Sequence, residues 1–424
     1  MMRNVKRSVY WFRSRFWDSL GSGLITGAAD DDPSGIATYS VAGAQLGTNL
    51  LWTALITWPL MAAVQMMCAR IGMVSGRGLT AAFKAKFPRP VVLLAIAALL
   101  AANTINVGAD LAGMADAAEM LTHISSHLWV VLFAVGISWA TVKLRYFQIA
   151  KTLKWLALVL FAYVISAFVV HPNWSAAIHD TLIPSMPRGK AGWETLVAIL
   201  GTTISPYLFF WQASQEVEEE KASGRNLLSR RKGATAQEIR TRKFDVGIGT
   251  FFSNLVMYFI ILTTAATLFT SGKRDIETSK DAALALMPLA GKFAALLFTV
   301  GVIGVGLLAI PTLTGSAAYA FAEAFGWKQG LDKRLAQARS FYLMILASTI
   351  AAVVLDFTRI NPVKALYWTA VINGVLAPFL LVGILIIASD SKLMSGQTSS
   401  RLGKMVVGIT AAAMFVAAIA MFLV

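Results

Sequence analysis

Long apolar stretches recur along the whole chain and are separated by short polar segments. Each stretch approaches the ~20 residues that a helix needs to cross the hydrocarbon core of a bilayer. Backbone polar groups in lipid need partners within the same segment, and a β-barrel would instead show alternation with a period of two. The pattern therefore predicts eleven membrane-spanning helices, near residues 20–43, 50–74, 92–122, 128–143, 151–170, 192–214, 246–271, 287–318, 340–356, 364–388 and 403–424.

Two of these spans are interrupted by polar residues and proline. The first contains the run Asp30-Asp31-Asp32-Pro33-Ser34-Gly35, and the sixth contains Ser205-Pro206. Because proline removes a backbone donor, each helix is expected to unwind there, and unwound backbone is tolerated at membrane depth only inside protein or beside a cavity. Broken helices at corresponding places in two halves are typical of an inverted-repeat transporter whose site lies near the membrane midplane.

The predicted fold class is therefore an all-α integral membrane protein with an inverted repeat of five plus five helices. The first repeat would cover about 20–170, the second about 192–388, and an additional helix about 403–424. Because no soluble segment of domain size is visible, residues 1–424 are predicted to form a single transmembrane transporter domain.

Composition agrees with this class and excludes several others. Hydrophobic residues make up 57% of the chain and charged residues 14%, whereas a soluble domain carries about 25% charged residues. The single cysteine, Cys68, excludes a disulfide within the chain and a cluster of thiolate metal ligands.

The net charge of +15 is explained by membrane topology and needs no nucleic-acid partner. With the N-terminus inside, 29 of the 37 Lys and Arg residues lie in inner segments. The positive-inside rule then predicts a multi-pass protein of the cell membrane, with a cytoplasmic N-terminus and an extracellular or periplasmic C-terminus. The acidic run that begins at Glu216 could form an ion vestibule, but the preferred interpretation is a solvated helix end in a cytoplasmic loop.

The chemistry at the two breaks is rich in oxygen. Three adjacent aspartates in an apolar span are costly and indicate a site, and the sixth span adds the hydroxyls of Thr202 and Ser205. Oxygen ligands suit Mg²⁺, Ca²⁺ or Mn²⁺, while the four histidines all fall in predicted outer loops. We expect a divalent cation as the transported ligand, with no resident cofactor. Because no nucleophile–base pair or phosphate-binding loop is visible, we expect no enzyme activity.

At these residues the chain resembles the NRAMP family of divalent metal transporters. The family carries Asp-Pro-Gly-Asn in its first helix, followed by an Ala-Thr…Gln-Ala-Gly-Ala-Gln-x-Gly stretch, and this chain has DPSGIATYSVAGAQLG from Asp32 to Gly47. Segments that resemble the second, third and eighth helices follow in order, at Ala69–Gly72, Asp110–Ala112 and Thr312–Gly315. The resemblance covers nearly the whole chain and implies a LeuT-like fold.

The resemblance also implies a metal site, position by position. The family's Asp corresponds to Asp32, the carbonyl three residues before it to Ala29, and its Asn to Gly35. On the sixth helix, the alanine whose carbonyl binds metal corresponds to Thr202 and the methionine to Ser205. The residues expected near this site or in its vestibule are Asp30, Asp31, Asp110, Tyr207, at the position of the family's histidine, and Asn373.

The departures from the family pattern bear on the choice of ion. The missing methionine removes a soft ligand that disfavours hard ions, and glycine in place of Asn enlarges the site for an ion such as Mg²⁺ that keeps several waters. Because the histidine is replaced, a carrier of protons is lost as well. The pattern resembles the divergent NRAMP-related magnesium transporters, which carry Mg²⁺ and Mn²⁺ without evident proton coupling.

The sequence therefore predicts uptake of Mg²⁺ or Mn²⁺ by alternating access without obligatory proton coupling. One alternative is a proton-coupled Mn²⁺ or Fe²⁺ symporter, in which Asp30, Asp31 and Asp110 carry protons. A second is a LeuT-like carrier of amino acids or other organic solutes, although three aspartates would repel a carboxylate. A third is a metal sensor or an enzyme embedded in the membrane. The bilayer and the metal ion are the expected partners, and the oligomeric state is left open.

Overall fold

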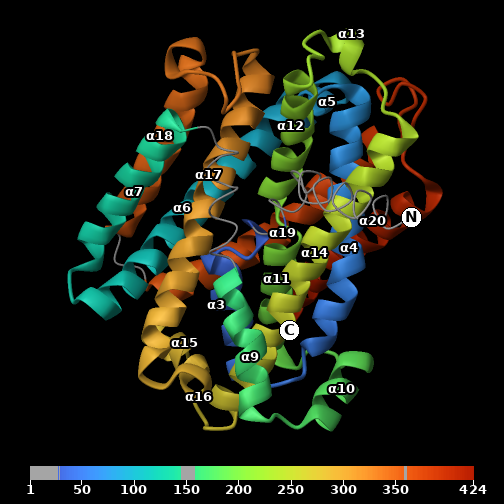
Figure 1. Cartoon of the computed structure of the whole chain (residues 1–424). Helices are drawn as coiled ribbons and strands as arrows, with labels where there is room; N and C mark the ends of the chain where they lie inside the picture. The colour runs from blue at the N-terminus through green and yellow to red at the C-terminus, as the bar shows by residue number, and fades with distance from the viewer. Residues whose placement is uncertain (1–26, 28, 145–157, 358–360) are drawn as a thin grey trace, which may run out of the picture.

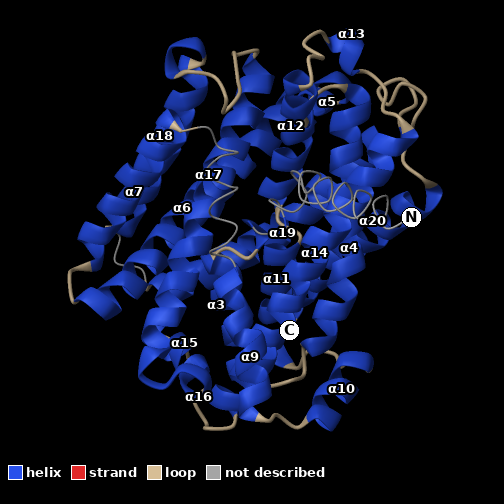
Figure 2. Cartoon of the chain, viewed as in Figure 1, coloured by secondary structure: helices blue, strands red, loops and turns tan. Residues whose placement is uncertain are grey.

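The computed structural model describes residues 27, 29–144, 158–357 and 361–424. These residues are helical with short connections, and no strand occurs among them (Figures 1 and 2). Within this part of the chain, nine helical runs are long and apolar enough to cross a membrane. They are α4 (Leu51–Ser75), α6 (Arg89–Thr122), α7 (Ser126–Lys143), α11 with α12 (Gly189–Ala222), α14 with the π-helical turn η2 (Ala236–Phe269), the run Ser279–Phe325 that ends in α17 (Ala294–Phe325), α18 (Arg339–Asp356), α19 (Pro362–Ser389) and α20 (Arg401–Leu423).

These nine runs coincide with nine of the eleven predicted spans. The other two lie partly outside the described residues: α3 (Pro33–Leu46) is the second half of the predicted first span, and α9 (Phe161–Val170), preceded by the turn Leu158–Leu160, ends the fifth. The predicted all-α membrane architecture is confirmed, because length and apolar composition are enough to define helices in lipid.

Five short helices lie at the two ends of the bundle. Four of them were not predicted, and the fifth, α16 (Met287–Ala290), lies at the start of the predicted span 287–318. In Figure 1, α5 (Leu79–Lys86) and α13 (Leu228–Arg231) lie at one end, and α10 (Trp174–Leu182), α15 (Ser279–Ala283) and α16 (Met287–Ala290) at the other. They are too short to show a clear apolar period. Two of them, α10 and α15, have a side-chain cap at their first turn, as where the Asn173 side chain accepts from the Ala176 amide at 3.1 Å.

Both predicted helix breaks are present, and they are built alike. Helix α3 starts directly after Asp32 with Pro33 in its first turn, and α12 (Pro206–Ala222) starts directly after Ser205 with Pro206 in its first turn. Proline suits this position because the first amides of a helix have no partner within the helix. In Figure 1, α11 (Gly189–Thr203) and α12 follow one another through the centre of the bundle.

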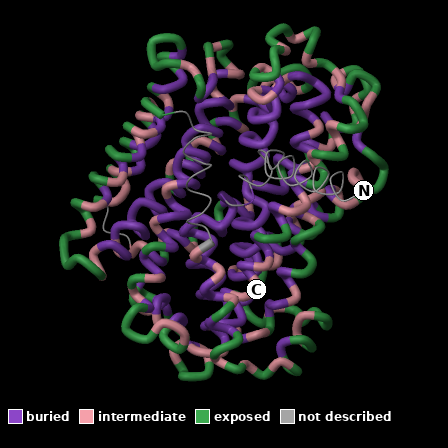
Figure 3. Tube along the Cα trace, in the orientation of Figure 1, coloured by how far each residue is buried: buried purple, intermediate pink, exposed green. Residues whose placement is uncertain are grey.

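The breaks lie in the buried centre of the molecule. Figure 3 shows the central helices buried along most of their length, while exposed residues follow the outer faces and the ends. Helix α3 packs against α14, α19 and α11, and α11 packs closely against α19. These packings bring the first break next to the second.

Candidate functional site

Asp32 has two distinct roles at the first break. Its Oδ1 accepts from the Gly35 amide at 2.8 Å and from the Ser34 hydroxyl at 2.7 Å, so this oxygen caps α3. Its Oδ2 instead accepts from Asn106 Nδ2 of α6 at 3.2 Å. Capping therefore occupies one carboxylate oxygen and leaves the other directed at a neighbouring helix.

A buried polar group extends from Asp32 across α6 to α19. Asn106 Nδ2 also donates to Asp110 Oδ2 at 3.0 Å, and Asn373 Nδ2 of α19 donates to Asn106 Oδ1 at 3.4 Å. Asp110 and Asn373, both expected near the site, are thus joined to Asp32 through one amide. Asn106 itself was missed, although its spacing of one turn from Asp110 in an apolar span was a signal.

Asp30 and Asp31 belong to a different cluster. The Ser253 hydroxyl of α14 lies 2.6 Å from Asp30 Oδ2 and 3.2 Å from Asp31 Oδ1. The three aspartates are therefore divided between α6 and α14, as expected for consecutive side chains. Within the described residues, no three His, Cys, Asp or Glu side chains converge as a ligand group. No pattern in the sequence indicated Ser253.

The second break faces the first. The Tyr207 hydroxyl donates to the Ala29 carbonyl at 2.9 Å, and a Cβ added to Gly35 would lie 3.2 Å from Thr202 Oγ1. The hydroxyl of Ser205 contacts the carbonyls of Gly201 and Thr202, both at 2.7 Å. Ala29, Gly35, Thr202 and Tyr207 are thus brought together, whereas Ser205 is turned back onto the end of α11.

Some oxygens around the breaks have no hydrogen-bond partner. Asp30 Oδ1 and Asn373 Oδ1 are both buried and unpartnered, and an unsatisfied buried polar atom costs about 1–3 kcal/mol. A cation bound between the helices would be one way to satisfy such acceptors. The donor set around the breaks consists of carboxylate, amide, hydroxyl and carbonyl oxygens, which suits hard divalent cations.

The chain is similar in sequence to a known protein family and to two curated transporters. The profile of the family described as Natural resistance-associated macrophage protein-like (Nramp) matches residues 23–424. The divalent metal cation transporter MntH of Yersinia pestis is 27% identical over 402 residues, which cover 92% of this chain and 91% of that protein. MntH of Erwinia tasmaniensis is 28% identical over 321 residues, 72% of each chain.

Solved structures show the same fold. The crystal structure of the Eremococcus coleocola manganese transporter, in complex with an aromatic bis-isothiourea substituted compound, matches with a TM-score of 0.77 at 18% identity, over 95% of this chain and 86% of that one. The inward-facing conformation of Mhp1 matches with a TM-score of 0.54 at 13% identity, over 94% and 90%.

Proposed function

This chain belongs to the Nramp family, and we propose that it is a secondary transporter that carries divalent metal cations across the membrane by alternating access. The observation that supports this most directly is the pair of broken helices, whose flanking residues Ala29 and Tyr207 meet through a hydrogen bond. Broken helices of this kind bind ions with freed carbonyls and half-helix ends. The relatives named as divalent metal cation transporters point to the same cargo.

Within this function, we propose Mg²⁺ or Mn²⁺ as the cargo, held partly hydrated near Asp32. The ligands would be Asp32 Oδ2, the Ala29 carbonyl and Thr202. Gly35 lets Thr202 lie close to the first break, because a Cβ there would already be 3.2 Å from Thr202 Oγ1. Ser205 would take part once its hydroxyl turns from the α11 carbonyls. An all-oxygen site without sulfur or imidazole favours hard ions that keep several waters.

The membrane potential is sufficient to drive this uptake without protons. Moving one charge across 100 mV is worth about 2.3 kcal/mol, so a divalent ion gains about twice that. The alternative, a proton-coupled Mn²⁺ or Fe²⁺ symporter, is favoured by the Asn106–Asp110 pair beside Asp32, because a carboxylate linked to the site could carry a proton.

The test is metal flux into proteoliposomes with an imposed potential and an internal pH dye. We expect uptake of Mg²⁺ and Mn²⁺ without acidification, and its loss in Asp32→Ala. The matched control is Asp390→Ala, which removes a carboxylate that pairs with Lys86 at 2.5 Å far from the breaks, and it should keep its flux. Uptake of Mn²⁺ that excludes Mg²⁺ and acidifies the lumen would instead establish the symporter. Competition by amino acids but not metals would establish an organic solute carrier, and metal binding without flux a sensor.

A further inference from the structure

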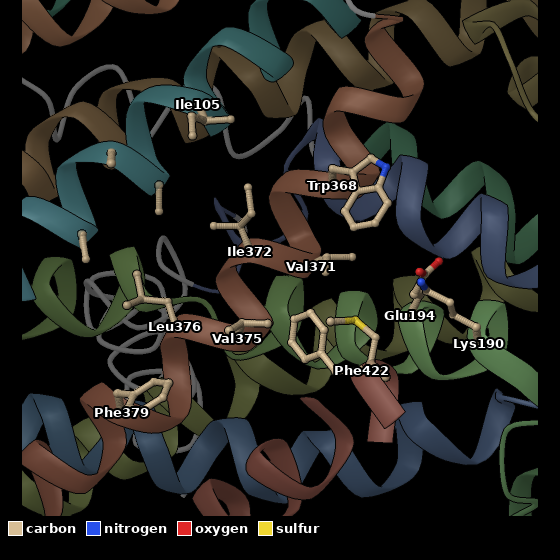
Figure 4. A pocket seen from close by; sticks show the side chains of 14 residues that line it. Ile105, Lys190, Glu194, Trp368, Val371, Ile372, Val375, Leu376, Phe379 and Phe422 are labelled. Atoms are coloured by element: carbon tan, nitrogen blue, oxygen red, sulfur yellow. The ribbon is translucent and has the colours of Figure 1, made fainter. Parts of the chain in front are cut away.

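A groove opens on the outer face of the bundle between α6, α11, α19 and α20. It has a volume of about 530 Å³, and Figure 4 shows its lining side chains. Most of them are apolar, among them Ala101, Ile105, Leu376, Phe379 and Phe422. Several are strongly exposed, as Phe379 is at 62% and Phe422 at 76%, so in the membrane this groove faces lipid.

One end of the groove is charged. Lys190 and Glu194 lie in the first two turns of α11, and Figure 4 shows them with Trp368 at the end opposite Leu376 and Phe379. Neither charged side chain makes an ion pair or hydrogen bond with another described residue. Lys190 is exposed and Trp368 is 48% exposed, as is usual at the membrane–water interface.

The length of the groove corresponds to one leaflet. Trp368 and Phe379 are both on α19, and eleven residues at 1.5 Å each place them roughly 16 Å apart along the helix. The hydrocarbon core is ≈30 Å thick, so this is about the depth that one acyl chain spans from the interface to the midplane.

We propose that this groove binds one phospholipid whose headgroup carries both a phosphate and a primary ammonium. Lys190 would bind the phosphate, Glu194 would accept hydrogen bonds from the ammonium, and one acyl chain would lie along α19. Charge-assisted hydrogen bonds of this kind are the strong ones. A quaternary ammonium has no N–H to donate to Glu194, and an anionic glycerol headgroup offers it no cation. The pair of opposite charges therefore selects the zwitterion with a primary amine.

The test is native mass spectrometry of the full-length protein with added phosphatidylethanolamine, phosphatidylcholine or phosphatidylglycerol. We expect phosphatidylethanolamine to be retained at least threefold more than either of the others. Glu194→Gln should remove this preference, whereas Lys190→Ala should reduce the retention of all three lipids, because each of them carries a phosphate. The control is Lys364→Ala, an exposed lysine at the start of α19 that does not line the groove, and it should keep both the retention and the preference.

A second pair of variants tests the position of the acyl chain. Ala101→Trp would fill the apolar part of the groove and should reduce retention of all three lipids, whereas Leu343→Trp on α18, 61% exposed on another face, should not. Equal retention of the three lipids by the parent protein would overturn the proposal. So would a preference that survives Glu194→Gln, an unchanged retention of all three lipids in Lys190→Ala, or full retention in Ala101→Trp. Because only lipid retention is measured, these outcomes do not depend on the transported ion.

Discussion

The hydrogen bond between Tyr207 and Ala29 occupies part of the carbonyl oxygen that the proposed site would use as a metal ligand. In the present conformation the Tyr207 hydroxyl donates to that carbonyl at 2.9 Å, and both residues are buried. A carbonyl oxygen has two lone pairs, so the bond leaves one of them available, yet it holds the two breaks together and competes with a metal ion for the same atom. In the proposed site, the hydrogen bond therefore lowers the affinity of this oxygen for a metal ion.

Tyr207→Phe removes the competing donor and keeps the ring. A net hydrogen bond is worth about 0.5–1.5 kcal/mol, so we expect the apparent affinity for Mn²⁺ to rise about two- to tenfold in a binding titration. The control is Tyr367→Phe on α19, which removes a hydroxyl 3.1 Å from that of Thr195 and away from the breaks. It should leave the affinity unchanged. A weaker affinity in Tyr207→Phe would mean that the hydroxyl itself holds the ion or its water.

At the level of single residues, the breaks could be located from the sequence, but not all of their partners. Asp32 and Pro33 could be singled out because a carboxylate beside a proline is costly in an apolar span unless the segment forms a site. Asn106 and Ser253 could not be ranked in the same way, because amides and hydroxyls are common in membrane helices, and their contacts with Asp32, Asp30 and Asp31 are made across helices. The ligand roles given to Asp32, Ala29, Thr202, Ser205 and Gly35 stay predictions.

Among the helices, the approach of α11 to α19 fixes how close Thr202 can come to the first break. A Cβ added to Gly201 would lie 2.7 Å from Gly374 Cα, so the two backbones touch at these glycines. Small residues allow such contact between membrane helices. Gly201 directly precedes Thr202 and Gly374 directly follows Asn373, so this contact point also positions two expected site residues.

Gly201→Ala should therefore destabilise the bundle even though alanine favours a helix. Overpacking of a tight contact costs about 1–3 kcal/mol, and we expect a lower unfolding temperature in detergent together with slower metal flux. Gly136→Ala on α7 is the matched control, because its Cβ would meet nothing within 4 Å. There the helix propensity of alanine should leave the unfolding temperature equal or slightly higher. Equal effects of the two substitutions would contradict the contact.

The long spans were predictable and the short helices were not, for the same physical reason. A membrane span carries its signal in its own composition, so α4, α6, α17 and α19 follow from apolar length alone. Helices such as α10 are stabilised by a cap and by contacts with the bundle. Neither gives a clear pattern in the local sequence. The same limit led to one wrong interpretation, at the acidic end of α12.

At the scale of the whole molecule, the acidic end of α12 is joined to α14 by buried ion pairs and is not a solvated helix end. Arg242 of α14 pairs with Glu216 at 2.7 Å, with Asp245 at 2.6 Å and also with Glu219. Glu216 and Asp245 are each 2% exposed. A cavity of about 470 Å³ lies beside them, lined by Glu216, Glu220 and Arg242 among others. In the proposed alternating-access function the two ends must open and close in turn, and these charge pairs join α12 to α14 at one end, beside a polar cavity.

Arg242→Gln should therefore shift the molecule towards a conformation open at this end. Removing one partner of a buried ion pair costs about 3–5 kcal/mol, because Glu216 and Asp245 are left buried without their cation. Opening exposes them to water and relieves that cost, so the open population should grow.

A cysteine introduced by Val246→Cys measures how often this end opens. Val246 is 1% exposed and lies one turn after Arg242, and the single native thiol, Cys68, is also buried. We expect a membrane-impermeant thiol reagent to label this introduced thiol slowly when Arg242 is present. With Arg242→Gln, labelling should be at least fivefold faster. Both proteins are compared only where they elute as a single folded species. Arg240→Gln, an exposed arginine on the same helix, should not change the rate. If labelling stays slow with Arg242→Gln in folded protein, the ion pairs serve stability alone, and another contact must hold this end of the transporter closed.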